Sequence, residues 1–317
     1  MKRHLLTLLL LIPVCSKAQS KELLQRIDRF HTLKRLSFEK KYDSVVAIAG
    51  KLPFRDSLYL YATEGFMTTA LLHLGDTTTA LKYLVKTIEN QGYESRANIH
   101  YSLEHFGLDS NREYKEIVRN FDTHFSKHIQ QLNLPMLQEC LEIYYTDTRT
   151  RYLWMMAEPG SKMQAYADSL QDKSDLMNVE AMTNILRKYK RFPGISEIGI
   201  SFCNNFKHIL AHFAYLLPQD TLMLYLKEAT LKGELPNHYG PFLIDKRARQ
   251  YEKGMQTYGV YGNASDYIDG EFHYPPIKDI DYVDKRRADF LLPPLYKMLE
   301  VEKSVLPKDY DRTKQKR

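Results

Sequence analysis

Residues 245–259 read Asp-Lys-Arg-Ala-Arg-Gln-Tyr-Glu-Lys-Gly-Met-Gln-Thr-Tyr-Gly and form the densest patch of polar side chains and glycines in the chain. An apolar run, residues 239–244, precedes this stretch. Because Gly254 and Gly259 disfavour a regular helix, we predict that a helical region ends within it. Gly, Asp and aromatic residues follow, so we expect a loop-rich or small β segment near 255–280.

The composition indicates an ordinary globular protein. Of 317 residues, 44% are hydrophobic and 26% are charged, and this length suggests about two domains. The net charge of +6 comes from the two ends, since residues 2–17 and residues 302–317 each contribute a net charge of +3. The neutral remainder gives no electrostatic footprint for nucleic acid. We expect residues 302–317 to form a basic disordered tail.

The first 18 residues have the pattern of a secretory signal peptide. Two basic residues precede an apolar run at 5–14, and small residues precede Gln19. We predict that residues 1–18 are removed and that the protein is exported to the periplasm or the extracellular space. Lipoprotein processing at Cys15 is the alternative, which we do not prefer because Val14 stands where Gly, Ala or Ser is usual. No other apolar run reaches about 18 residues, so we expect no membrane span.

The remaining cysteines, Cys140 and Cys203, lie among apolar residues at helical spacing. We prefer two buried thiols over the disulfide that secretion would permit.

Two histidine pairs have a spacing of four residues, His124 with His128 and His208 with His212. No nearby carboxylate or cysteine completes a ligand set at either pair, so we predict no metal and no cofactor. We interpret the first pair as exposed residues and the second as core or site residues.

Residues 58–92 have the pattern of a helical hairpin with a turn at Gly75-Asp76. The run at 70–84, Ala-Leu-Leu-His-Leu-Gly-Asp-Thr-Thr-Thr-Ala-Leu-Lys-Tyr-Leu, resembles a tetratricopeptide repeat. Gly75, Ala80 and Tyr83 occupy its turn, small and aromatic positions. The resemblance implies that the N-terminal region, residues 19–120, binds another protein. A plain helical bundle is the alternative.

Residues 130–301 form the predicted second domain, which contains the candidate chemistry. Asp147 and Arg151 lie four residues apart on a predicted helix at 136–156, so they share a face. A histidine oriented by a carboxylate is an arrangement typical of general bases. The catalytic candidates are His212, Asp245 and Asp147. The ligand-binding candidates are Arg151, Gln256, Tyr258, Gly259, Arg286 and Arg287.

Over roughly 135–300 the chain resembles a family of bacterial proteins known only as a domain of unknown function. The motifs that carry the resemblance are Phe192-Pro193-Gly194-x-Ser196-x-x-Gly199, His212, Gly233-Glu234-Leu235, Leu243-Ile244-Asp245-Lys246, Gly254-x-Gln256-x-Tyr258-Gly259, Pro276-Ile277-x-Asp279 and Val283-Asp284-x-Arg286-Arg287. The resemblance implies no particular activity. The chain departs from the family pattern at Thr148, Ala211, Lys246, Val260 and Tyr261, which puts any shared chemistry in doubt.

These observations predict a mainly α protein, in which an N-terminal helical-hairpin region packs on a mostly helical C-terminal domain. A nucleophile elbow, a phosphate-binding loop and a dinucleotide fingerprint are absent from the sequence. We therefore favour an exported protein-interaction or ligand-binding module. The alternative is a hydrolase-like enzyme that uses His212 with Asp147 or Asp245. A purely structural explanation is also open, in which Asp245 forms a buried ion pair with Arg286 or Arg287.

Overall fold

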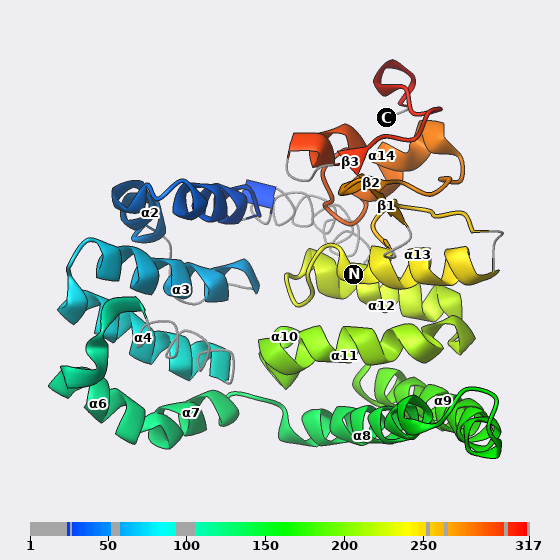
Figure 1. The fold of residues 1–317 in the computed structure, drawn as a ribbon, viewed down its shortest axis with the longest axis horizontal. Helices are drawn as coiled ribbons and strands as arrows, with labels where there is room; N and C mark the ends of the chain where they lie inside the picture. The colour runs from blue at the N-terminus through cyan, green and yellow to red at the C-terminus, as the bar shows by residue number, and fades with distance from the viewer. Residues whose placement is uncertain are drawn as a thin grey trace, which may run out of the picture. The chain divides into compact units, whose positions relative to one another are not determined.

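The computed structural model describes residues 24–25, 27–51, 58–92, 105–251, 254–262, 266–300 and 304–315. These residues are mainly α-helical and include one small three-stranded sheet near the C-terminus (Figure 1). The prediction of a mainly α chain with a small β segment is confirmed. The predicted signal peptide, including Cys15, lies outside the described residues.

The chain divides into two compact units. Unit 1 contains residues up to 137 together with 193–203, and unit 2 contains 138–192 and 204–317. The division therefore passes through helices α8 (Leu134–Met156) and α11 (Ile200–Phe213). The residues between the two predicted domains, 19–120 and 130–301, lie inside unit 1 and form helix α7 (Phe121–Ile129).

Unit 1 is a stack of helices that lie side by side (Figure 1). A helical segment at 27–38 precedes α2 (Tyr42–Ala49), α3 (Leu58–His73), α4 (Thr77–Gln91), η2 (Leu108–Ser110), α6 (Arg112–Arg119), α7 and α10 (Ile195–Ile198). The α3–α4 turn falls at Gly75-Asp76 as predicted. Asp76 also caps α4, because its side chain accepts a hydrogen bond from the Thr79 N–H at 3.0 Å. Aliphatic side chains such as Leu33, Leu84 and Ile88 form the core of the stack.

His128 is buried in unit 1, so our interpretation of it as an exposed residue is wrong. Only 8% of the residue is exposed, and burial lowers the pKa of its imidazole. Two glycines with positive φ, Gly92 and Gly199, leave the space that its ring occupies. The partner of the pair, His124, is half-buried and contacts the Glu89 carboxylate at 2.9 Å. His128 thus connects the end of α4 to α7 and the start of α11.

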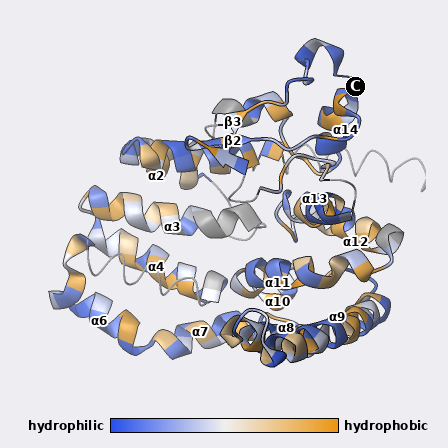
Figure 2. Ribbon diagram, turned by 45° about the vertical axis from the view of Figure 1, so that its right-hand side comes forward, coloured by the Kyte–Doolittle hydropathy of each residue, from blue (hydrophilic) through white to orange (hydrophobic). Residues whose placement is uncertain are grey.

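Unit 2 is built on long helices, each of which carries both hydrophobic and hydrophilic residues (Figure 2). They are α8, α9 (Lys162–Tyr189), α11 with η3 (Ala214–Leu216), α12 (Gln219–Leu231) and α13 (Tyr239–Tyr251). Apolar periodicity in the sequence predicts a helix from about Asn178 to Lys190. Helix α9 begins sixteen residues earlier, because Ser161 caps its N-terminus. Cys140 and Cys203 are buried thiols, as predicted, and no disulfide joins them.

The C-terminal part of unit 2 carries the sheet. Strand β1 (Tyr267–Ile268) pairs antiparallel with β2 (Glu271–His273), and β2 pairs parallel with β3 (Ser304–Val305). Short helices η5 (Ile280–Tyr282), α14 (Val283–Ala288), η6 (Leu295–Glu300) and η7 (Arg312–Lys314) complete it. Residues 304–315 differ from the disordered tail that we expected, since they contain β3 and since the Tyr310 hydroxyl donates to Asp284 at 2.8 Å.

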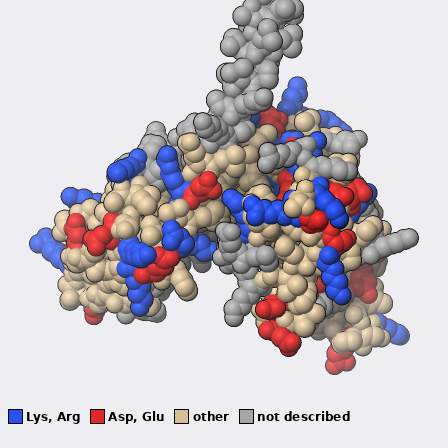
Figure 3. Space-filling view, turned by 90° about the horizontal axis from the view of Figure 1, so that it is seen from above, with Lys and Arg blue, Asp and Glu red and all other residues tan. Residues whose placement is uncertain are grey.

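The described surface carries both signs of charge. Lys and Arg alternate with Asp and Glu on the face drawn in Figure 3, without a large area of one sign. Among the described helices, none is both long and apolar enough for a membrane span.

Candidate functional site

The central feature of unit 2 is a buried carboxylate on α8. Asp147 is only 1% exposed, because it lies on the face of α8 opposite to solvent-exposed Tyr145 and Tyr152. Its Oδ1 accepts from Nε of Arg151 at 3.0 Å, so the predicted i, i+4 pair forms. The acid of this pair is buried, whereas the Arg151 side chain is 24% exposed. A buried carboxylate is stable only when hydrogen bonds and opposite charges compensate its desolvation.

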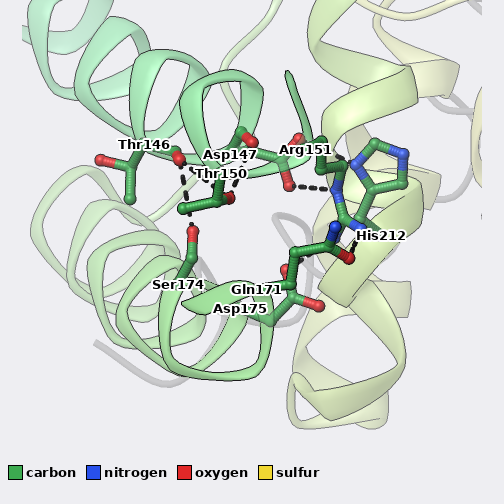
Figure 4. Close-up of polar contacts among 8 residues, drawn as sticks. All are labelled: Thr146, Asp147, Thr150, Arg151, Gln171, Ser174, Asp175 and His212. Atoms are coloured by element: carbon green, nitrogen blue, oxygen red, sulfur yellow. Dashed lines mark hydrogen bonds and ion pairs between the residues drawn. The ribbon is translucent and has the colours of Figure 1, made fainter. Parts of the chain in front are cut away.

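The second oxygen of Asp147 binds His212, in the last turn of α11. Nδ1 of His212 lies 2.9 Å from Oδ2 of Asp147. The His212 side chain is 28% exposed, whereas that of Asp147 is 1% exposed. The imidazole therefore stands between a buried carboxylate and solvent, and its second nitrogen, Nε2, points away from the acidic side chains (Figure 4).

Helix α9 adds two polar side chains through Arg151. Nη1 of Arg151 donates to Gln171 at 3.0 Å, and Nη2 donates to Asp175 at 2.8 Å. Burial raises the pKa of the Asp175 carboxyl, although the Arg151 charge opposes this effect. Arg151 thus fixes α8 to α9 and holds Asp147 in position. Its three hydrogen bonds to protein groups favour this positioning role over the ligand contact that we predicted.

Helix α13 carries Lys246, whose ammonium group is affected by the charges of Asp147, Arg151 and Asp175. Lys246 is partly buried, and burial together with the Arg151 charge lowers the pKa of its ammonium group. Asp147 and Asp175 act on it in the opposite direction, so this ammonium lies within electrostatic range of both acids. Lys246 makes no ion pair or hydrogen bond in the part of the chain that the structure describes.

Aromatic side chains lie at both ends of this region. His208, one turn before His212, makes an edge contact with Phe242 at 6.2 Å between ring centroids. Tyr215 and Tyr251 pack at 4.8 Å, and burial raises the pKa of Tyr215 to about 12. Helix α11 with η3 and helix α13 therefore lie beside each other and run in the same direction. The side chains of one polar cluster come from α8, α9, α11 and α13. We call Asp147, Arg151, Gln171, Asp175, His212 and Lys246 the α8–α13 cluster.

Asp245 belongs to a different arrangement, although it precedes Lys246 on α13. It is 0% exposed, and its carboxylate accepts three backbone N–H groups. Oδ1 accepts from Thr257 at 2.6 Å and Tyr258 at 2.8 Å, and Oδ2 accepts from Val260 at 2.8 Å. Asp245 therefore fixes the loop that follows α13, which explains why the polar stretch of the sequence ends in glycine-containing irregular backbone.

The predicted ligand-binding residues of this loop are likewise used by the protein itself. Arg287 is 0% exposed and donates to the carbonyls of Tyr258 at 2.6 Å and Pro293 at 2.7 Å. Arg286 donates to the Thr257 carbonyl at 3.0 Å. The side-chain amide of Gln256 donates to the Tyr261 carbonyl. Asp245 and Arg287 thus hold the same backbone segment, one through its N–H groups and the other through its carbonyls.

The direct ion pair that we considered for Asp245 with Arg286 or Arg287 is therefore replaced by separate hydrogen bonds to the backbone. Tyr258 is buried, and its ring meets Phe290 at 5.5 Å. Burial raises the pKa of Tyr258 to about 12. Gly259 has a φ of +65°, and its carbonyl accepts from Arg287 at 3.3 Å. We call Asp245, Gln256, Tyr258, Gly259, Arg286 and Arg287 the loop clamp.

The nine predicted site residues therefore fall into two groups. Asp147, Arg151 and His212 meet in the α8–α13 cluster, and the other six form the loop clamp. Sequence reasoning missed Gln171 and Asp175 because we began α9 at 178. A helix begun at Ser161 would have placed these two residues four apart on one face.

The described residues contain no group of three or more His, Cys, Asp and Glu side chains that could hold a metal ion. What the α8–α13 cluster offers instead is an oriented imidazole, an ammonium group and two carboxylates. Comparison of the chain with protein-family models, with curated proteins and with solved structures finds no match.

Proposed function

We propose that the protein is an exported ligand-binding module and that the α8–α13 cluster is its binding site. The observation that carries the proposal is the 2.9 Å contact between Nδ1 of His212 and the buried Asp147 carboxylate. An acid buried to this degree costs stability unless it is fully paired. Hydrogen bonds of this kind hold a side chain in one orientation, and here they orient the His212 imidazole next to solvent.

The loop clamp supports the choice of the α8–α13 cluster. The side chains of Asp245, Arg286 and Arg287 bind backbone groups of the same unit, which gives them a structural explanation. Oε1 of Gln256 and Nη2 of Arg287 have no hydrogen-bond partner among the described residues, but both atoms are buried away from solvent. In contrast, Nε2 of His212 and the ammonium group of Lys246 have no hydrogen-bond partner among the described residues. Groups that are oriented but unused are the better candidates for contact with a ligand.

The proposal is tested by thermal unfolding of the full chain in the presence of sulfate, acetate, glucose and diglycine. At least one of these probes should raise the melting temperature of the wild-type protein, and His212→Gln should abolish that rise. Glu142→Gln is the matched control, because Glu142 is an exposed acid on α8. The proposal fails if no probe stabilises the wild type, or if His212→Gln responds as the wild type does.

A hydrolase-like enzyme is the second candidate, and the same His212–Asp147 contact favours it. A histidine held by a carboxylate is suited to act as a general base. Among the described residues, no Ser, Thr or Cys side chain binds His212, so the base would activate water. Hydrolysis of p-nitrophenyl acetate or p-nitrophenyl phosphate should then fall about 100-fold or more in both His212→Gln and Asp147→Asn.

Export and partner binding complete the proposal. Protein recovered from outside the cytoplasm should begin at Gln19 by mass spectrometry, whereas a retained Met1 would contradict export and a lipid on Cys15 would support the alternative.

We also propose that unit 1 binds another protein. The stacked helices from 27–38 to α7 support this, since arrays of short helices commonly form extended binding surfaces.

A further inference from the structure

We infer that the α8–α13 cluster binds an oxyanion, which is the carboxylate or phosphate group of a small molecule, between His212 and Lys246. The inference rests on the proposed function, since it names the chemical class of the ligand at that site. It follows from the arrangement of charged groups in the α8–α13 cluster, where the acids are buried and the basic groups around them are partly exposed.

The acids of the cluster form its inner layer. Asp147 is 1% exposed and Asp175 is 8% exposed. Both bind Arg151, at 3.0 and 2.8 Å, and Asp147 also binds His212. The carboxylates are therefore already occupied by protein groups, so they offer little to a cationic ligand.

The basic groups form the outer layer. Lys246 and His212 are both partly exposed, and exposed His208 lies one turn before His212 on α11. Lys207, which precedes His208, lies over the Phe242 ring at 5.0 Å. These four groups come from α11 and α13 alone, and the groups that face them from α8 and α9 are Asp147, Arg151 and Asp175.

The basic groups repel one another. The pKa of His208 is lowered by burial, by Lys207, by His212 and by Lys246. The pKa of Lys246 is lowered by burial and by Arg151. Like charges held at close quarters are stabilised by an anion that binds between them. The ammonium of Lys246, without an ion pair among the described residues, is the group that such an anion would satisfy.

His212 offers this anion a second hydrogen-bond donor. When Nδ1 donates to Asp147, an imidazolium presents its second N–H group at Nε2. His212 also lies in the last turn of α11, where the helix dipole favours a cation. The imidazolium would then stand between the buried carboxylate and the bound oxyanion, with a charge-assisted hydrogen bond on each side.

The test is a titration of the full chain with sodium sulfate or sodium acetate, followed by NMR of the histidine side chains. Sodium chloride at equal ionic strength controls for screening. Sulfate represents a tetrahedral phosphate and acetate a planar carboxylate, so the arm that saturates identifies the source. We expect one of them to shift the His212 resonances with saturation, and Lys246→Gln to weaken that binding about tenfold or more.

Arg247→Gln is the matched control, because it removes one positive charge from the neighbouring position of α13. Arg247→Gln should leave the affinity within about twofold of the wild type. The inference is overturned if both variants weaken binding equally, or if neither anion shifts His212 beyond the effect of chloride. If a neutral probe such as glucose shifts His212 while the anions do not, the binding site stands and only the assignment of ligand class is wrong.

Discussion

At the residue scale, the chemistry of unit 2 is decided by how its two most buried aspartates are satisfied. Asp245 accepts hydrogen bonds only from backbone N–H groups, so its carboxylate holds the loop after α13 in place. Asp147 accepts only side chains, one of which reaches solvent. Two acids of similar burial therefore have different roles, because only Asp147 passes its orientation to a group that a ligand could touch.

Asp245→Asn should destabilise unit 2 by about 2–3 kcal/mol. The amide would replace an acceptor oxygen with an NH₂ group that faces backbone N–H donors, which leaves buried donors unsatisfied. Chemical unfolding followed by the fluorescence of Trp154 measures this loss. Asp289→Asn is the control, because Asp289 pairs with Lys227 at an exposed site and should change stability by less than about 1 kcal/mol. An Asp245→Asn variant as stable as the control would refute the clamp.

Glu64 should make unit 1 sensitive to pH. Burial raises the pKa of this carboxyl to about 7, and its Oε2 atom has no hydrogen-bond partner. Since the folded pKa lies above the unfolded value, this stabilising contribution is complete below about pH 4.5 and is lost as the pH rises through about 7. Melting curves between pH 4.5 and 8 should show a stability loss of up to about 3 kcal/mol.

Glu64→Gln should remove most of this pH dependence, because the amide oxygen can still accept from Asn90 and the side chain no longer ionises. The exposed Glu116→Gln variant serves as the control and should keep the wild-type profile. A Glu64→Gln profile parallel to that of the wild type would show that another group titrates.

At the element scale, glycines at helix ends decide how close neighbouring helices approach. Gly75 and Gly92 follow α3 and α4, and both have positive φ, at +83° and +65°. A Cβ atom on Gly75 would meet nothing within 4 Å, whereas one on Gly92 would lie 2.5 Å from Cδ2 of His128. The two positions share a backbone requirement and differ in packing.

Gly75→Ala and Gly92→Ala should therefore differ in cost. Both should lose about 1–2 kcal/mol, because a non-glycine residue is strained at positive φ. Gly92→Ala should lose a further 1–3 kcal/mol or so from overpacking against His128. Melting temperatures from circular dichroism compare the two variants directly, and equal losses would mean that the His128 ring moves aside freely.

At the scale of the whole molecule, the sequence predicted the helical class, the 58–92 hairpin, the β segment and the pairing of Asp147 with Arg151. These follow from periodicity and turn residues, which act locally. It did not separate the α8–α13 cluster from the loop clamp. Asp245 and Lys246 are adjacent in sequence but serve different groups, and only the three-dimensional course of α13 and its following loop reveals which neighbours each one meets.

The sequence also misplaced His128 and the start of α9. A histidine in a polar segment looks exposed until the glycines that accommodate its ring, distant in sequence, are brought beside it. The first half of α9 has few large apolar residues on its buried face, where Gln171 and Asp175 bind Arg151 and Ala167 is fully buried. Hydrophobic periodicity therefore gave no signal there.

The most direct test of the account is the protonation state of His212 in a long-range proton–nitrogen NMR spectrum of the full chain. The account predicts that neutral His212 carries its proton on Nδ1, because that nitrogen donates to the Asp147 carboxylate. Asp147→Asn should remove this preference, and Glu142→Gln should keep it. A neutral His212 protonated at Nε2 in the wild-type protein would contradict the oriented imidazole on which both proposals depend.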